Sequence, residues 1–183
     1  MHVDGRVAEF EIDSEQLPYI RRTGSRQQDL LDKMRNIDPF LFEDVCAKVL
    51  AKLGAESRTT VKTNDGGVDF VATKLKFLPS TLPLPQSCHA SVIGQAKRYK
   101  LGANIGEVKI REFVGAALLR RHTMGLESNL SPLAPTLFAF WTTSDLEPNA
   151  RRFARSVGVW YMDGATLASY CEFLGLRQFI MDI

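Results

Sequence analysis

The chain has 183 residues, of which 45% are hydrophobic and 24% are charged, and its 23 Lys and Arg against 21 Asp and Glu leave a formal net charge of +2. This balance is typical of a globular protein and excludes both a histone-like basic tail and an acidic disordered chain. It leaves nucleic-acid binding open, because a local basic patch matters more than the sum of charges. The length indicates one domain, alone or with an appended arm.

The cysteines, histidines and apolar runs argue against several classes of protein. Cys46, Cys88 and Cys171 are widely spaced and form no C-x-x-C motif, and the three histidines have no ligand spacing. We therefore expect neither a disulfide framework nor a zinc hydrolase, but reduced thiols in a cytoplasmic protein. The sequence also contains no run of about 20 apolar residues and does not begin like a signal peptide, so we expect no membrane association.

Residues 1–35 differ from the rest because they are polar, rich in arginine and poor in large apolar side chains. We predict that they form an arm or a linker, with a short strand over 6–12 and a helical turn over 29–34. A domain over 36–183 follows. Its first helix is predicted from Asp38 as N-cap and Pro39 as first helical residue, and it ends at Gly54.

Strand and helix patterns then alternate along the domain. A helix is predicted from Asn104, and its expected buried stripe is Ile110, Phe113, Val114, Ala117 and Leu118. The other expected elements are strands over 56–63, 67–77, 89–99, 136–143 and 159–162, helices over 148–156 and 165–174, and a proline-rich loop over 78–88. This order predicts an α/β fold in which helices flank a mixed central β-sheet.

Two neighbouring predicted strands carry polar and charged side chains where a buried strand would carry apolar ones. Asp69 lies between two apolar residues, and Gln95 and Lys97 point to the same face of their strand because side chains alternate. An anion, an amide and a cation thus come to the ends of two strands. A divalent metal held by Asp69, with Lys97 beside a bound water, would account for all three. An ordinary cross-strand ion pair between Asp69 and Lys97 is the alternative, and spacing alone does not decide between them.

The first predicted helix favours the metal site. Glu43 falls at the margin of the apolar stripe of this helix, whereas Asp44, Lys48 and Lys52 point away from it. A second carboxylate would thus border the buried face, within reach of a metal or its water. Taken alone, Glu43 is explained equally well as a surface glutamate.

These residues resemble the catalytic domain of Mrr-type restriction endonucleases, which belong to the PD-(D/E)xK nuclease superfamily. The resemblance covers about residues 36–175 and implies a restriction-endonuclease-like fold. Its motifs stand in the family's order, and they are Leu41-Phe42-Glu43, Gly54, Asp65-Gly66-Gly67-Val68-Asp69, Gln95-Ala96-Lys97-Arg98-Tyr99, Glu112-Phe113-Val114-Gly115-Ala116, Thr142-Thr143-Ser144 and Asp163-Gly164. The proline-rich segment 78–88 and residues 1–35 depart from the family pattern.

The resemblance implies a role for each site residue. Asp69 would be the principal metal ligand, and Gln95 stands where most of the superfamily has an acid, so the affinity for metal is expected to be modest. The backbone carbonyl of Ala96 would be a further ligand. Lys97 would position or activate the attacking water, and Glu43 would support the site. Oxygen ligands of this kind suit magnesium, or alternatively manganese.

Basic residues near these motifs are candidates for binding DNA phosphates, which gives affinity without sequence information. Arg98, Tyr99 and Lys100 continue the strand that ends at Lys97, and the next helix carries Lys109 and Arg111. No motif that reads bases is present. Recognition is therefore expected from residues 1–35, from the proline-rich loop, or from a separate domain or subunit.

Three functions fit these features. The first is a metal-dependent DNA endonuclease of restriction type, which hydrolyses phosphodiester bonds in duplex DNA. The second is a junction-resolving or repair nuclease of the same fold, and the third is a non-catalytic DNA-binding module, against which the intact Asp69, Gln95 and Lys97 argue. Because a double-strand cut needs two sites and the chain carries one, we expect a homodimer in which residues 1–35 dock between protomers.

Overall fold

The computed structural model describes residues 2–3, 6–7, 9–12, 18–22, 24–60, 67–76, 88–127 and 134–183, with the backbone alone before residue 24 and over 123–127. A five-stranded sheet lies at its centre. The strand order is β11 (Trp160–Met162), β9 (Thr136–Thr142), β7 (His89–Lys97), β6 (Phe70–Lys76) and β5 (Glu56–Thr59). The first three strands are parallel, whereas β6 and β5 run antiparallel to their neighbours. The predicted mixed sheet is confirmed.

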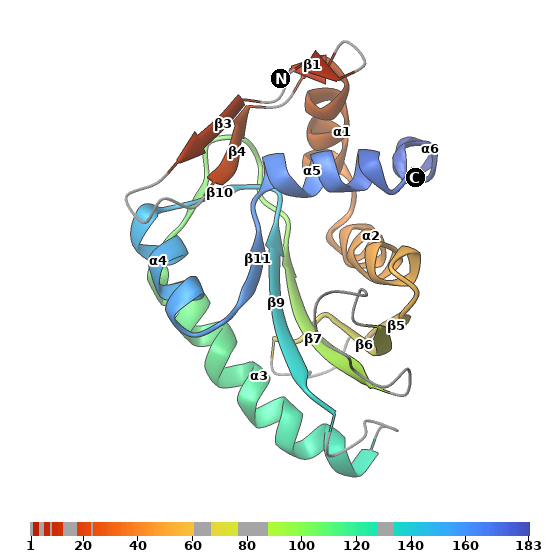
Figure 1. Cartoon of the computed structure of the whole chain (residues 1–183), viewed down its shortest axis with the longest axis vertical. Coiled ribbons are helices and arrows are strands. Elements are labelled where there is room, and N and C mark those ends of the chain that lie inside the picture. The colour runs from red at the N-terminus through yellow and green to blue at the C-terminus, as the bar shows by residue number, and fades with distance from the viewer. Residues whose placement is uncertain are drawn as a thin grey trace.

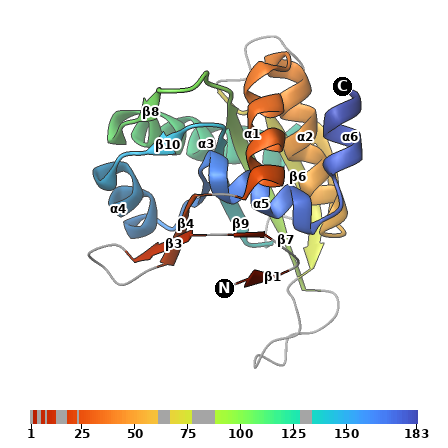
Figure 2. The ribbon, with the colours of Figure 1, turned by 90° about the horizontal axis from the view of Figure 1, so that it is seen from above.

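Helices cover both faces of this sheet (Figure 1). One face carries α1 (Ser25–Asn36), α2 (Pro39–Lys52), α5 (Gly164–Phe173) and α6 (Arg177–Asp182). The other face carries α3 (Glu107–Glu127) and α4 (Pro148–Ser156). Figure 2 shows the same division from above. No helix in the described part of the chain is both long enough and apolar enough to span a membrane.

Each face of the sheet has its own apolar core. On the α2 side, Phe42, Phe70 and Trp141 are fully buried, and the rings of Phe70 and Trp141 lie 5.0 Å apart between centroids. On the α3 side, Phe113 and Phe140 pack edge to face at 5.6 Å. Burial of such aromatic side chains supplies much of the free energy that holds the layers together.

The first helix of the predicted domain forms as the sequence indicates. The carboxylate of Asp38 accepts a hydrogen bond of 2.8 Å from the backbone N–H of Phe40, and Pro39 is the first helical residue. Gly54 follows the helix with a φ of +85°, a conformation that side chains with a Cβ rarely adopt. This helix, α2, places Glu43 over the strands that carry the other candidate site residues.

The segment before α2 is more ordered than predicted. In place of a helical turn over 29–34, the structure has the twelve-residue helix α1, and its Leu30, Leu31 and Met34 are buried in the same core as Phe42. Three apolar residues on one side of a helix are enough to dock it on a core that other elements build. The division into an arm and a domain stays a prediction, but α1 belongs with the domain, so we place the start of the domain at Gly24.

Four short strands precede α1. The single strand expected over 6–12 is divided into β2 (Arg6–Val7) and β3 (Glu9–Ile12). The first pairs with β1 (His2–Val3) and the second with β4 (Pro18–Arg22), each in an antiparallel hairpin. Strand β4 also contacts α5, which places this hairpin against the domain.

Further expectations need correction. The helix predicted from Asn104 begins at Glu107, because Asn104–Ile105 form β8, which pairs with β10 (Asp145–Leu146). Leu118 is 51% exposed and does not belong to the buried stripe of α3, since it lies about 100° around the helix from buried Ala117. Helix α6 was not predicted. Asp65 and nearly all of the proline-rich loop lie outside the described residues.

Candidate active site

Asp69 is held at the edge of the sheet where β6 begins. Its backbone N–H donates to the carbonyl of Gly94 at 2.9 Å, which continues the β6–β7 ladder by one residue. Its carboxylate Oδ2 accepts a hydrogen bond of 2.8 Å from the backbone N–H of Ala96, and the residue is 9% exposed. A buried carboxylate is thus fixed against the middle of the segment that carries Gln95 and Lys97.

The amide of Gln95 has a defined orientation. Its Nε2 donates a 2.6 Å hydrogen bond to the carbonyl of Gly67, which can only accept. The other amide atom of this buried side chain is therefore the oxygen, Oε1, which is a potential metal ligand. Gly67 has a φ of +82°, and a Cβ on it would lie 3.0 Å from Gln95 Nε2. A glycine is therefore needed here for the close approach as well as for the backbone.

Gln95, Lys97 and Tyr99 line one cavity of about 350 Å³ between β7 and α3. This arrangement follows from alternation along the strand, which turns every second side chain to the same face, as predicted for Gln95 and Lys97. Lys97 is half-buried there. The remaining lining residues are Gly67, Lys109, Glu112, Phe113 and Ala116. Asp69 meets this group at the strand edge, through its hydrogen bond to Ala96.

Glu43 and Asp69 act on the same buried thiol from two elements. Burial raises the pKa of Cys46 well above its ordinary value, and the charges of Cys171, Asp69 and Glu43 raise it further. Both carboxylates therefore lie within electrostatic reach of Cys46 on α2. Glu43 is half-buried, as the margin of an amphipathic stripe requires, and its supporting role stays a prediction.

The donor atoms at this edge suit a hard divalent cation. A carboxylate, a side-chain amide oxygen and a backbone carbonyl are the oxygen ligands that magnesium and manganese prefer. The N–H of Ala96 points to Asp69. In an extended strand the C=O of a residue points to the same side as its N–H, so the Ala96 carbonyl also faces this edge. Within the described ranges, no group of three or more His, Cys, Asp and Glu side chains is gathered in one place, so a metal here depends on the amide and the backbone carbonyl.

The structure separates the candidate DNA-binding residues into two groups. Tyr99 and Lys109 line the cavity, and Lys100 is exposed beside it. Arg98 donates from Nη1 to the carbonyl of Arg35 at 2.7 Å, so it ties β7 to the end of α1. Arg111 is directed along α3 and towards α4, because it pairs with Glu107 at 2.6 Å and its guanidinium lies 4.0 Å from the centre of the Phe153 ring.

Glu112 is a cavity residue that the sequence analysis did not assign to the site. Its carboxylate pairs with Lys109 Nζ at 2.8 Å. This hydrogen bond and the charge of Glu112 raise the pKa of the Lys109 ammonium. The spacing of three residues on a helix was the available signal, because it places the two side chains side by side. The pair puts one negative charge into a cavity that otherwise carries two lysines.

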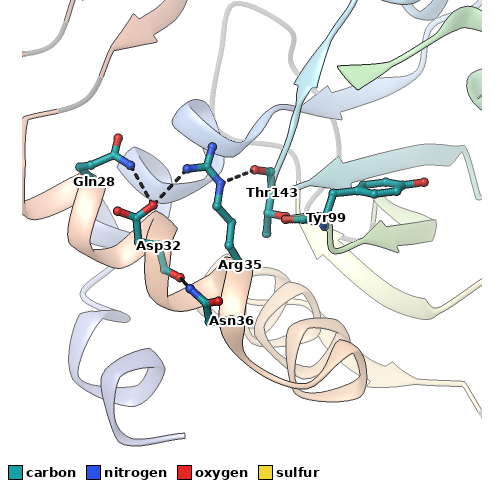
Figure 3. Close-up of polar contacts among 6 residues, drawn as sticks. All are labelled: Gln28, Asp32, Arg35, Asn36, Tyr99 and Thr143. Atoms are coloured by element: carbon teal, nitrogen blue, oxygen red, sulfur yellow. Dashed lines mark hydrogen bonds and ion pairs between the residues drawn. The ribbon is translucent and has the colours of Figure 1, made fainter. Parts of the chain in front are cut away.

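Thr142, Thr143 and Ser144 were also missed as part of the site. All three are buried, and their hydroxyls donate to backbone carbonyls between residues 97 and 103. Figure 3 shows Thr143 between Tyr99 and Arg35 of α1, whose Nε donates to the Thr143 carbonyl at 3.2 Å. Three hydroxyl residues at the end of a very apolar strand were the signal in the sequence.

A comparison with family sequence models decides the relationship. The model of the restriction endonuclease family Mrr_cat matches residues 34–171, which is most of the chain. The chain belongs to this restriction endonuclease family. The Mrr-type resemblance inferred from the motifs is thereby confirmed, and membership supports a DNA nuclease. No curated protein matches the chain significantly.

Solved structures share the Mrr-type fold at low sequence identity. MspJI restriction endonuclease in complex with a 27-mer oligonucleotide has a TM-score of 0.54 and 20% identity, over 86% of this chain and 35% of that one. The DNA modification-dependent restriction endonuclease AspBHI has a TM-score of 0.57 and 20% identity, over 92% and 40%. A structure of restriction endonuclease FokI has a TM-score of 0.51 and 12% identity, over 92% and 35%. The Mrr-type chain thus spans between about a third and two fifths of the length of these proteins.

Proposed function

We propose that this chain is the catalytic part of a metal-dependent DNA endonuclease of restriction type, which acts in the cytoplasm and hydrolyses phosphodiester bonds in duplex DNA. The observation that carries the proposal is the 2.8 Å hydrogen bond from Ala96 to the buried Asp69 carboxylate. It brings a negative charge to the strand segment from which Gln95 and Lys97 enter the cavity. An anion, a neutral oxygen donor and a cation in this order suit a metal and a scissile phosphate.

Asp69, Gln95 Oε1 and the carbonyl of Ala96 would hold magnesium or manganese. When bound, such an ion polarises a phosphoryl oxygen and lowers the pKa of a coordinated water. Phosphodiester hydrolysis needs a reduction in barrier on the order of 15–20 kcal/mol, which is more than one lysine supplies. A set with one carboxylate and two neutral oxygens is expected to bind the ion modestly.

Lys97 would position the attacking water and stabilise charge on the phosphate. Its backbone is fixed by the β7–β9 ladder, whereas its half-buried side chain faces the cavity. Catalytic groups that are oriented before the substrate binds need less reorganisation during the reaction. Glu43, on α2, would support the site through its field.

DNA would be bound along the cavity rim by Tyr99, Lys100 and Lys109. Contacts of this kind give affinity independent of sequence. Arg98 and Arg111 have partners on α1 and on α4, so we assign them weaker contributions to DNA affinity. Recognition of a sequence or of a modified base is assigned to the proline-rich loop, to the segment before Gly24, or to a separate domain or subunit.

A homodimer would supply the second site that a double-strand cut requires. The segment before Gly24 is the proposed docking arm. Removal of residues 1–23 should then weaken dimerisation and convert double-strand cutting into nicking, while α1 remains in the core. Removal of residues 1–35 would not test this, because it deletes Leu30, Leu31 and Met34 from the core. A monomer on DNA that makes double-strand breaks in one encounter, detected by sedimentation, would contradict the dimer.

One experiment separates the candidate functions. Purified protein is incubated with supercoiled plasmid, methylated or unmethylated, and with a four-way DNA junction, each with and without magnesium. Cleavage of plasmid that requires magnesium supports the restriction-type nuclease. Cleavage confined to the junction favours the resolving or repair nuclease. Binding without cleavage under all conditions favours the non-catalytic module.

A further inference from the structure

The last turn of strand β9 carries three buried hydroxyls in succession. Thr142 and Thr143 have no exposed surface, and Ser144 is 3% exposed. Buried hydroxyls require hydrogen-bond partners, and here all three donate to the segment that follows the active-site strand β7. They therefore connect β9 to residues 97–103, which the sheet ladder no longer holds.

Thr142 acts on the backbone of Lys97. Its Oγ1 donates to the Lys97 carbonyl at 2.7 Å, and the backbone N–H of Thr143 donates to the same carbonyl at 3.2 Å. The Thr142 hydroxyl also accepts a hydrogen bond of 3.1 Å from the backbone N–H of Ser144. Two donors from β9 therefore fix the carbonyl of the residue that carries the cavity ammonium.

Thr143 acts on the backbone of Tyr99 by both of its polar groups. The Thr143 hydroxyl accepts from the Tyr99 N–H and donates to the Tyr99 carbonyl, each at 2.8 Å. One side chain thus replaces the two hydrogen bonds that a neighbouring strand would make. The carbonyl of Thr143 in turn accepts from Arg35 Nε at 3.2 Å, so helix α1 holds the arrangement from outside the sheet (Figure 3).

The position of these contacts connects them with the cavity. The β7–β9 ladder ends at the pair of Lys97 and Thr142. Beyond it the hydroxyls continue the fixed part of the chain as far as Tyr99, and Lys97 and Tyr99 both line the cavity. Valine would fill the same space as threonine at these buried positions. The hydroxyls therefore serve the backbone of the opposite segment and not the packing.

We propose that Thr142 and Thr143 are positioning residues for the nuclease reaction, which hold the backbones of Lys97 and Tyr99 so that both side chains face the scissile phosphate. The proposal rests on the proposed function. It assigns Thr142 to the catalytic lysine and Thr143 to the DNA-contacting tyrosine. The two residues should therefore affect different kinetic constants.

The test compares Thr142→Val and Thr143→Val with the corresponding serine variants. Valine keeps the volume and removes the hydroxyl, whereas serine keeps the hydroxyl. Because small displacements of catalytic groups cost up to about 100-fold in rate, kcat of Thr142→Val should fall roughly 10- to 100-fold with KM for duplex DNA within about twofold. For Thr143→Val, KM should rise about fivefold, since one DNA contact is displaced. Both serine variants should lie within about threefold of the original protein.

Ser57→Ala is the matched control. Ser57 Oγ donates to the carbonyl of Ala47 at 2.6 Å, so this variant also loses a hydroxyl-to-backbone hydrogen bond, but between α2 and β5. All variants are assayed well below their thermal midpoints. Unchanged kcat and KM in both valine variants would overturn the proposal, and so would an equal loss of activity in Ser57→Ala.

Amide hydrogen exchange tests the positioning without catalysis. Thr143→Val removes the acceptor of the Tyr99 N–H, so exchange at Tyr99 should accelerate at least about tenfold, and it should not accelerate in Thr143→Ser or Ser57→Ala. Unaltered exchange in Thr143→Val overturns the positioning even if cleavage falls. An original protein that cleaves no DNA overturns the proposed function itself, whereas an active original with unaffected valine variants overturns only the role of the threonines.

Discussion

The two faces of strand β7 show how one element serves stability and a site. Towards α2 it presents Val92 and Ala96, which pack with Phe70 and Trp141 in an apolar core. Towards α3 it begins with Ile93 in the second core and ends with Gln95 and Lys97 at the cavity. One face is apolar throughout, whereas the other becomes polar only where β6 has ended and the sheet edge is open.

The difference has a physical cause. A polar side chain on a packed sheet face costs free energy unless it finds a partner, so such residues concentrate where the neighbouring strand and helix leave room. Substitutions on the α2 face should therefore change the free energy of unfolding. Substitutions on the polar end of the α3 face should change activity.

The largest expected effect separates the two faces most clearly. Lys97→Ala should lower the rate of plasmid cleavage by about 10³-fold, because the cavity loses its strand-borne cation, and leave the free energy of unfolding within about 0.5 kcal/mol. Lys52→Ala, on the exposed side of α2, is the control and should cleave normally. Undiminished cleavage by Lys97→Ala would remove the proposed mechanism.

On the opposite face, Phe42→Ala should destabilise the protein by about 3–5 kcal/mol in urea unfolding, since it empties a fully buried position in the core. The neighbouring Phe40 is 44% exposed, and Phe40→Ala should cost far less. At temperatures where Phe42→Ala is folded, its cleavage should approach that of the original protein. A stable Phe42→Ala variant would show that the α2-side core does not hold the fold.

Asp69→Asn should weaken the binding of magnesium or manganese at least tenfold by titration calorimetry and abolish cleavage. The substitution removes the charge, while the asparagine oxygen still accepts from the Ala96 N–H, so the fold should persist. Asp44→Asn, an exposed carboxylate on α2, should bind as before. Equal affinity of Asp69→Asn and the original protein for the ion would show that Asp69 is not a ligand.

A smaller effect separates backbone strain from contact with the site. Gly67→Ala and Gly102→Ala both place a Cβ at a φ above +80°, which costs about 1–2 kcal/mol. A Cβ on Gly67 would also lie 3.0 Å from Gln95 Nε2, whereas Gly102 has open space around it. Both variants should lose stability, but only Gly67→Ala should lose cleavage. Equal cleavage in the two would show that the orientation of Gln95 does not matter.

The smallest effect concerns the thiols of the α2-side core. Burial raises the pKa of Cys171 to about 12, and it raises that of Cys46 as well. Above pH 9 the unfolded thiols lose protons that the folded ones retain, so the free energy of unfolding should fall by up to about 1.4 kcal/mol per pH unit for each thiol. Urea unfolding at pH 7 and pH 10 measures this, with Cys171→Ala as the variant in which the slope decreases. An unchanged slope in that variant would contradict the assignment.

Much of the fold could be predicted because its signals are local. The Asp38-Pro39 start, the apolar spacing of α2 and the alternation along β7 each depend on residues close in sequence. Helix α1 was underestimated because its stability comes from docking Leu30, Leu31 and Met34 on distant elements. The start of α3 was misplaced because Asn104–Ile105 pair with β10, a contact that spans some forty residues.

The candidate site divides in the same way. By itself the sequence determined the family, the mixed sheet, and the placement of Gln95 and Lys97 on one strand face, because motif order and a period of two residues are properties of the chain alone. Only the tertiary structure decided that the Asp69 carboxylate meets the Ala96 N–H and that α3 brings Glu112 and Lys109 into the cavity. It also decided that Thr142 and Thr143 hold the end of β7. These contacts join residues on different elements, and their hydrogen bonds depend on distances that only the packed layers fix.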